Sequence, residues 1–258
     1  GHCDLSFAYC RNAGAAEGCG AVMRAVSMRT ISGCRVVCAA LSLVFLSGFA
    51  LGQTPASGDP APATTVTFTL DFPLSDPTHY SIAVDANGHA SYECTVKDQE
   101  NSEEQPYRAE FNLSAANRQR IFEWAKQAKY FSGKVDSGNR KLAFTGDKIL
   151  TYQDGERSYT ARYNYSNLEP VRQLTTLFQS MESTLDYGRR LAYYHRYQKL
   201  ALDDELKRME ADARNNELSE IQSVEPVLQE IVEDNSVINM VRARAKTLIQ
   251  MQSNAAER

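Results

Sequence analysis

The stretch at residues 78–96, THYSIAVDANGHASYECTV, decides the fold, because two runs of alternating apolar and polar residues flank Ala-Asn-Gly at 86–88. A two-residue turn would set Ile82 opposite Glu93 and mix the two faces of the hairpin. A three-residue loop, with Gly88 in the left-handed conformation, keeps one face apolar, so we predict this loop and place Cys94 in the core. The predicted cross-strand pairs are Tyr80 with Cys94, Ile82 with Tyr92 and Val84 with Ala90.

Further strand and helix patterns lie on both sides of this hairpin. Residues 64–72 alternate with one apolar face, residues 107–113 form another strand, and residues 141–165 are rich in strand signals. Between these strands, Ser114 is a good cap for a helix over residues 115–130. The sequence therefore predicts hairpins interrupted by one helix.

A second hairpin is indicated by Asp154-Gly155. A two-residue turn there pairs Leu150 with Tyr159 and Tyr152 with Arg157. Beyond Ser166 the apolar residues recur at helical spacing to the C-terminus, with a break expected near Gly188. Because strands and helices are segregated along the chain, the fold class is α+β. We expect an antiparallel sheet with helices packed on one face, followed by a C-terminal helical segment.

An uncharged apolar run covers residues 36–51, shorter than the roughly 20 residues that a spanning helix needs. Two arginines precede it, and residues 50–52, Ala-Leu-Gly, give a small-x-small cleavage site before Gln53. This pattern is typical of a cleaved signal peptide, here at residues 28–52. An uncleaved single-pass anchor and a buried helix are the alternatives.

The signal peptide divides the chain into segments. They are residues 1–27, an unstructured over-extended gene start; 28–52, the signal peptide; 53–65, a flexible linker; 66–183, an α+β domain; and 184–254, a helical C-terminal region. Of six cysteines only Cys94 follows the cut, so the mature chain could form no internal disulfide. Cleavage removes four arginines and two acids from 28 basic and 32 acidic residues, leaving 24 and 30. Such an acidic protein is a poor general binder of nucleic acid.

Motifs for common chemistries are absent from the sequence. There is no Gly-x-Ser-x-Gly elbow, no Gly-x-Gly-x-x-Gly and no Walker loop, so we predict no cofactor. His79 and His89 lie at opposite ends of the hairpin and do not converge on a metal site. A hydrolase with an unrecognised site would need one of them to meet a carboxylate such as Asp85 in a cleft. Cys94 fits a small buried hydrophobe better than a nucleophile.

The first hairpin carries the pattern Tyr-x-Ile-x-Val-x-x-x-Gly-x-x-x-Tyr, and a helix ending in Tyr130-Phe131 follows it. In these features residues 66–185 resemble a family of small exported bacterial domains of unknown function. That family has Cys-x-x-x-Cys-Pro before the hairpin, whereas this chain has PLSDPTHY at residues 73–80. Any role tied to those cysteines is therefore not carried over.

Residues 225–249 are similar to a single HEAT-type helix pair, with Asp234, Val241, Arg242 and Ala245 at positions of its loose pattern. One such unit cannot form a solenoid, because stacking needs about three repeats. An ordinary helical hairpin is the alternative.

One predicted helix gathers basic and aromatic residues in GRRLAYYHRYQK, residues 188–199. Such a mixture can hold acidic partners, although lysine and arginine stems also cover apolar surface in a plain packing face. The candidate partner-contact surface consists of Arg189, Arg190, Tyr193, His195, Arg196, Tyr197 and Lys199.

Taken together, these features predict a periplasmic or secreted, non-catalytic protein that binds or scaffolds another envelope protein. The alternatives are a hydrolase with an unrecognised active site and a single-pass, signal-anchored envelope protein. We expect no nucleic-acid partner, and membrane contact only if the signal segment is retained.

Overall fold

The computed structural model describes residues 64–97 and 104–256. The predicted gene start at 1–27, the signal peptide at 28–52 and nearly all of the linker at 53–65 lie outside the described residues. Among the helices that are described, none is both long and apolar enough to cross a membrane.

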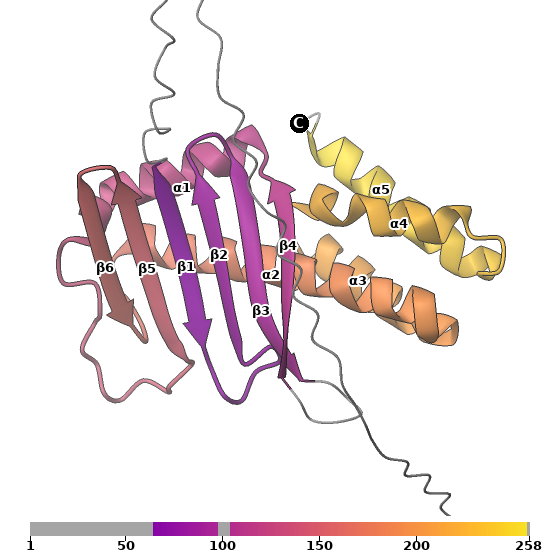
Figure 1. Cartoon of the computed structure of the whole chain (residues 1–258), viewed down its shortest axis with the longest axis horizontal. Coiled ribbons are helices and arrows are strands. Elements are labelled where there is room, and N and C mark those ends of the chain that lie inside the picture. Colours follow the sequence, from indigo (N-terminus) through magenta and orange to yellow (C-terminus); the bar gives the residue numbers. More distant parts are fainter. Residues whose placement is uncertain (1–63, 98–103, 257–258) are drawn as a thin grey trace, which may run out of the picture. The chain divides into compact units, whose positions relative to one another are not determined.

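A six-stranded antiparallel sheet forms the first layer, in the order β4-β3-β2-β1-β5-β6 (Figure 1). Its strands are β1 (Thr65–Asp71), β2 (His79–Asp85), β3 (His89–Lys97), β4 (Glu104–Asn112), β5 (Asp147–Asp154) and β6 (Arg157–Tyr163). The first strand pairs with both β2 and β5, so it joins the two hairpin systems. The predicted α+β class is confirmed.

The register predicted for the first hairpin is confirmed, with Tyr80 opposite Cys94, Ile82 opposite Tyr92 and Val84 opposite Ala90. Gly88 has a φ of 93°, and its amide donates to the carbonyl of Asp85 at 3.0 Å. All six paired side chains are buried. The apolar face therefore set the register, as expected from the pleat.

The register predicted for the second hairpin is wrong. Leu150 lies opposite Ala161 and Tyr152 opposite Tyr159, and the last pair is Asp154 with Arg157. Asp154 is thus the final strand residue rather than part of the turn. Its Oδ1 accepts the backbone amide of Arg157 at 3.2 Å, which closes the turn from its first position. The buried face is preserved, because the true and predicted pairings differ by two residues.

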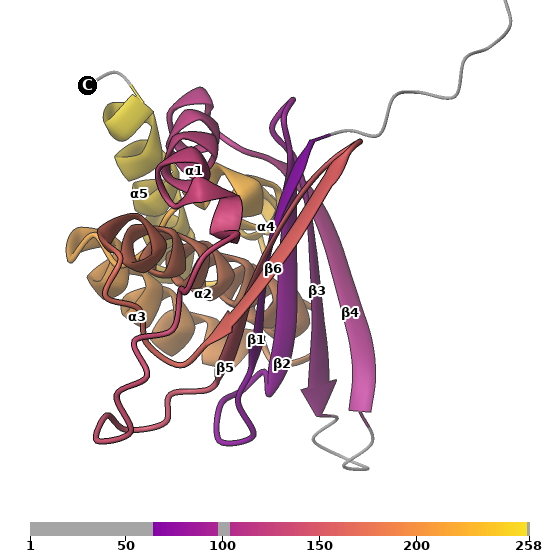
Figure 2. The same ribbon diagram turned by 90° about the vertical axis from the view of Figure 1, so that its left-hand side faces the viewer.

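Two helices cover one face of the sheet, as Figure 2 shows: α1 (Ala115–Gln127) and α2 (Glu169–Tyr197). The ring of Phe178 in α2 stacks on Phe68 of β1, with centroids 5.3 Å apart. Ile121 of α1 is fully buried in the same core. The predicted packing of helices on one face is therefore present.

The helix predicted over residues 115–130 ends earlier, at Gln127. Ser114 caps its start, with Oγ accepting the Asn117 amide at 3.3 Å. A short turn, η1 (Lys129–Phe131), follows with left-handed backbone at all three residues. The chain leaves the helix because this turn directs Phe131 into the core, where the side chain is buried.

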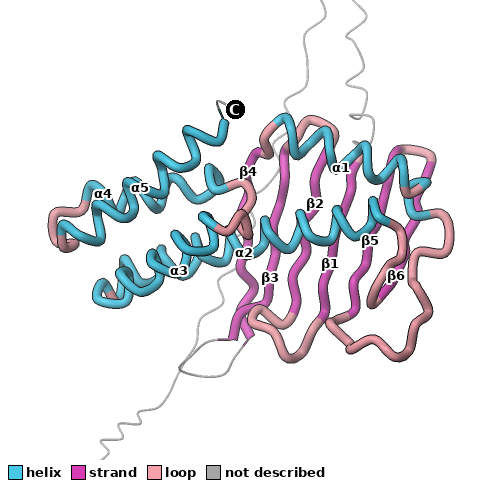
Figure 3. Tube along the Cα trace, turned by 180° about the vertical axis from the view of Figure 1, so that it is seen from behind, coloured by secondary structure: helices cyan, strands magenta, loops and turns pink. Residues whose placement is uncertain are grey.

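The C-terminal region is helical (Figure 3), with α3 (Leu202–Arg214), α4 (Glu225–Glu233), α5 (Asn239–Ala256) and the short turns η2 (Lys199–Ala201) and η3 (Ile221–Val224). Residues of α2 up to Leu185 pack in the sheet core, and those from Tyr187 onward pack in a second core with α3, α4 and α5. The helices expected over 225–249 form as α4 and α5. Their likeness to a HEAT-type pair stays a prediction.

The break expected near Gly188 is absent, because α2 runs through this residue. The glycine serves close packing instead. A Cβ at position 188 would lie 2.4 Å from Cγ1 of Val224, in η3. Glycine here allows η3 to approach the helix more closely than any other residue would.

Glu220, immediately before η3, connects the C-terminal region to the start of α1. Its carboxylate accepts the Ser114 amide at 2.8 Å, the Ser114 hydroxyl at 2.7 Å and the Asn117 side-chain amide at 2.6 Å. A carboxylate at a helix N-terminus is favoured by the helix dipole and by unpaired amides. Glu220 therefore completes the cap that Ser114 begins.

Candidate functional site

The seven residues of the predicted partner-contact surface lie in the last third of α2 and at the first position of η2. They form one stretch of chain beside α3 and the loop after α4. Their basic and aromatic members, however, face different surroundings. We describe the basic members first.

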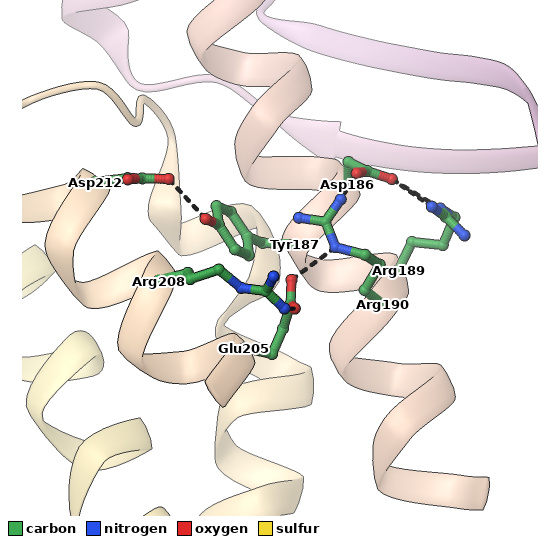
Figure 4. Close-up of polar contacts among 7 residues, drawn as sticks. All are labelled: Asp186, Tyr187, Arg189, Arg190, Glu205, Arg208 and Asp212. Carbon is green, nitrogen blue, oxygen red and sulfur yellow. Dashed lines mark hydrogen bonds and ion pairs between the residues drawn. The ribbon is translucent and has the colours of Figure 1, made fainter. Parts of the chain in front are cut away.

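Two of the arginines are held by buried carboxylates (Figure 4). The Arg189 guanidinium donates to Asp186 Oδ1 at 2.6 and 2.9 Å, and Arg190 Nε donates to Glu205 Oε1 at 2.6 Å. Arg190 also pairs with Asp186, and Arg208 of α3 pairs with Glu205. Because these carboxylates neutralise the guanidinium groups, little positive charge is left for an outside partner.

Tyr187 belongs to the same network (Figure 4). Its hydroxyl donates to Asp212 Oδ2 at 2.6 Å, and the Arg190 guanidinium lies 4.7 Å from the centre of its ring. Burial, followed by the bond to Asp212, raises the pKa of Tyr187, so the hydroxyl remains a donor. Through Arg190 and Tyr187 the network fastens α2 to α3, and Arg189 is held within α2 by Asp186. These contacts favour the packing interpretation for both arginines.

His195 and Lys199 are fastened to the loop after α4. Asp234 Oδ2 accepts from Lys199 Nζ at 2.5 Å and lies 2.9 Å from His195 Nε2. Lys199 also donates to Ser236 Oγ at 2.5 Å. The hydrogen bond from Lys199 is the largest cause that lowers the pKa of Asp234. These contacts hold the loop against the end of α2.

Four side chains at this end face solvent, and we call them the tip surface: Tyr193, Arg196, Tyr197 and Leu200. Tyr197 is 62% exposed and Leu200 is 94% exposed. The Arg196 guanidinium lies 5.3 Å from the Tyr197 ring centre, and the rings of Tyr193 and Tyr197 are 5.1 Å apart. Leu200 was missed, because the sequence analysis did not predict the interruption of the helix at η2.

The hairpin histidines lie on the sheet face opposite the helices. His79 is paired with Asp71, and His89 Nε2 lies 2.5 Å from Glu110 Oε2. Asp85 instead accepts two loop amides, at 2.8 and 2.9 Å, and shapes the turn. The hydrolase alternative named a carboxylate such as Asp85, and the two imidazoles instead meet Asp71 and Glu110. That alternative stays a prediction. Within the described ranges, no group of three or more potential ligands gathers as a metal site.

Cys94 lies in the sheet core as predicted, with 3% of its surface exposed. Burial raises the pKa of its thiol, so little reactive thiolate forms near neutral pH. Glu182 of α2 lies in the electrostatic surroundings of the same thiol. Burial outweighs the attraction of Arg190 and Arg189 and raises the pKa of Glu182 to about 7.

A shallow open groove of about 570 Å³ lies between α1 and the sheet. The side chains around it include Ala86, Arg118, Phe122, Lys126, Tyr130 and Tyr152. Three of them follow one another at four-residue intervals on α1, so they form one stripe of the helix. That spacing is visible in the sequence, but the sequence analysis named no candidate site on this helix.

Tyr130 reaches the groove from the left-handed turn η1. Its φ is 55°, a conformation that costs about 1–2 kcal/mol for a residue with a side chain. Its ring packs on Tyr152 with centroids 4.5 Å apart, and the Arg157 guanidinium lies 4.9 Å from the Tyr130 ring centre. This packing and the burial of Phe131 offset the strain, and an aromatic wall results.

Comparisons with known proteins assign this chain to no family. No family model matches it, and no curated protein matches it. The resemblance of residues 66–185 to exported bacterial domains therefore stays a prediction. Function rests on the contacts within the chain itself.

Proposed function

We propose that this chain is an exported, non-catalytic protein that binds or scaffolds another envelope protein through its tip surface. The observation that carries the proposal is the exposure of Tyr193, Tyr197 and Leu200 at the end of a fastened helix. Large apolar side chains on a rigid element lose little entropy on binding. The surface is therefore suited to a protein partner.

Two further features support a partner with an apolar contact patch. The cations around the tip are mostly paired with carboxylates, so an acidic ligand would gain little from them. Tyrosine and arginine are the residue types enriched at interface hot spots, and the tip surface offers both. Ile238, in the loop that Lys199 holds, and Met240, in the first turn of α5, are each 57% exposed. They add exposed apolar surface just after Ser236, the residue that Lys199 contacts.

Photo-crosslinking in cell envelopes tests the proposal. A benzoylphenylalanine at Tyr197 should give one protein adduct, and the same group at Thr176, exposed on α2 outside the tip surface, should give none. The Tyr197→Ala, Leu200→Ala double variant, with a benzoylphenylalanine at Tyr193, should lose the adduct at least tenfold, about 1.4 kcal/mol in affinity. Its circular dichroism should remain unchanged. Equal adducts at Tyr197 and Thr176, or an adduct that survives the double variant, would contradict the proposal.

Export is tested separately by the intact mass of the native protein from cell fractions. A soluble species that starts near Gln53 supports a periplasmic or secreted protein. A membrane-bound species that starts near Met28 supports the signal-anchored alternative. A cytoplasmic species contradicts both.

A further inference from the structure

The groove beside α1 combines an aromatic wall with two positive side chains. Phe122, Tyr130 and Tyr152 supply the rings, and Arg118 and Lys126 supply the charges. Among the described residues neither of these cations takes part in an ion pair, and the Arg118 guanidinium donates only to the carbonyl of Asn87. One carboxylate, Glu123, lines the groove as well. The groove therefore favours a ligand with flat apolar groups and a negative charge.

The described chain begins next to this groove. The carbonyl of Thr64 accepts the amide of Ala86, a groove residue, at 2.9 Å. Val66 then pairs with Tyr152, another groove residue. In Figure 1 the start of β1, the β2–β3 loop and α1 lie at the same end of the sheet. The segment that precedes Thr64 is therefore tethered at the groove.

The sequence of that segment matches the chemistry of the groove. Residues 55–63 read PASGDPAPA, with three prolines and Asp59 as the one charged residue. Proline-rich segments bind aromatic grooves because their extended conformation is already favoured, so little entropy is lost. Nine residues in this conformation reach about 28 Å, at about 3.1 Å each. The tether also raises the effective concentration, so a weak contact is sufficient.

We propose that residues 55–63 occupy the groove of their own chain. Pro60 and Pro62 would pack against the rings of Phe122 and Tyr130, with Asp59 toward the cations. The occupied groove would fix the direction in which the folded part leaves its N-terminal tether. This inference is independent of the tip surface, which lies at the far end of α2.

Photo-crosslinking within the full-length chain tests this proposal. A benzoylphenylalanine at Gln119, which lines the groove, should join to residues 55–63 in a product of monomer mass. The matched control is Arg120, the next residue of α1, which is exposed and does not line the groove. Peptide mass mapping should show several-fold less of this product from position 120.

The variant Pro60→Ser, Pro62→Ser changes no residue of the six described strands and should lower the adduct at position 119 several-fold. Equal yields with and without the prolines would overturn the proposal. A dimer-mass adduct would show that another copy supplies the occupant, and an adduct with a different protein would show a partner in the groove. Either result, or the absence of any adduct to residues 55–63, would also overturn it.

Discussion

The two cores that share α2 are stabilised in different ways. In the sheet core, aromatic rings such as Phe68 and Phe178 stack, and ion pairs such as His89 with Glu110 lie on the open face. In the helical core, aliphatic residues pack beside carboxylates that are themselves buried, including Asp186 and Glu205. The charged side chains of the sheet lie mostly outside its core, with Lys148 as a buried exception, whereas the helical core keeps ion pairs at its helix contacts.

Because of this difference, the two ends of α2 should respond to different perturbations. Apolar burial depends on shape and area and is only weakly affected by moderate salt. A buried ion pair adds little net stability when intact but is costly when one partner is removed. The helical core should therefore be the more sensitive to loss of a single charge.

The largest expected effects are losses in the free energy of unfolding, and their salt dependence should differ between the two cores. Glu205→Gln removes the carboxylate that Arg190 and Arg208 share. We expect a loss of about 2–3 kcal/mol in the free energy of unfolding, because both arginines retain some contact with water. Added sodium chloride should reduce this difference, since salt screens the charges left unpaired. Urea unfolding at low and high salt measures both effects.

Phe178→Ala, in α2, is the matched variant of the sheet core. It should cost about 3–5 kcal/mol, through the lost burial and the cavity beside Phe68. This cost should be nearly the same at both salt concentrations. If the two variants show the same salt dependence, the distinction between the cores is wrong.

The sequence predicted the sheet core more fully than the helical core, for a physical reason. Alternation in residues 78–96 leaves one register that buries an apolar face, so local pattern was enough. At the second hairpin the pattern predicted the buried face correctly but not the register. Two pairings that differ by two residues bury the same side, and Asp154 decides between them through its bond to the Arg157 amide.

The contacts around the candidate sites depend on long-range geometry. Glu220 caps a helix that starts more than a hundred residues earlier, and no local pattern joins it to Ser114. The basic stretch at 188–199 looked free to bind, although Asp186 in the same helix pairs with Arg189 and Arg190. The other carboxylates that neutralise it come from α3 and from the end of α4 and the loop after it. Sequence could identify the residue types there, but not which of them remained exposed.

A smaller effect is expected where the two cores meet at Gly188. In an isolated helix, Gly→Ala would be favourable by about 1 kcal/mol. Here the new Cβ would lie 2.4 Å from Val224 Cγ1, so Gly188→Ala should destabilise by about 1–2 kcal/mol. Thermal and urea unfolding measure the change.

The control is the double variant Gly188→Ala, Val224→Ala, which removes the clashing methyl groups. It should be more stable than the sum of the two single changes predicts, because the substitutions relieve one another. Strict additivity would mean that the contact between α2 and η3 does not require glycine.

The smallest effect tests whether the sheet core contains a titrating charge after all. The pKa of Glu182 is raised to about 7 by burial, from an ordinary value of 4.5, with Arg190, Arg189 and Asp76 as the nearby charges. Because the folded state binds this proton more tightly, the stabilisation is complete below pH 4.5 and is lost as pH rises through about 7.

With pKa values of 4.5 and about 7, wild-type stability would fall between pH 5 and 8 by about 2.5 kcal/mol more than that of Glu182→Gln, which cannot ionise. Because Glu182 is only partly buried, water screens the charge, and we expect about 1 kcal/mol. Urea midpoints across this pH range measure the difference. Glu169→Gln, at the exposed start of α2, tests whether removing any carboxylate from the helix has the same effect. If Glu182→Gln follows the wild-type curve, the carboxyl is already ionised in the folded state. In that case Glu182 would add no pH dependence to the sheet core. The two cores would then differ only in how they respond to packing changes and to salt.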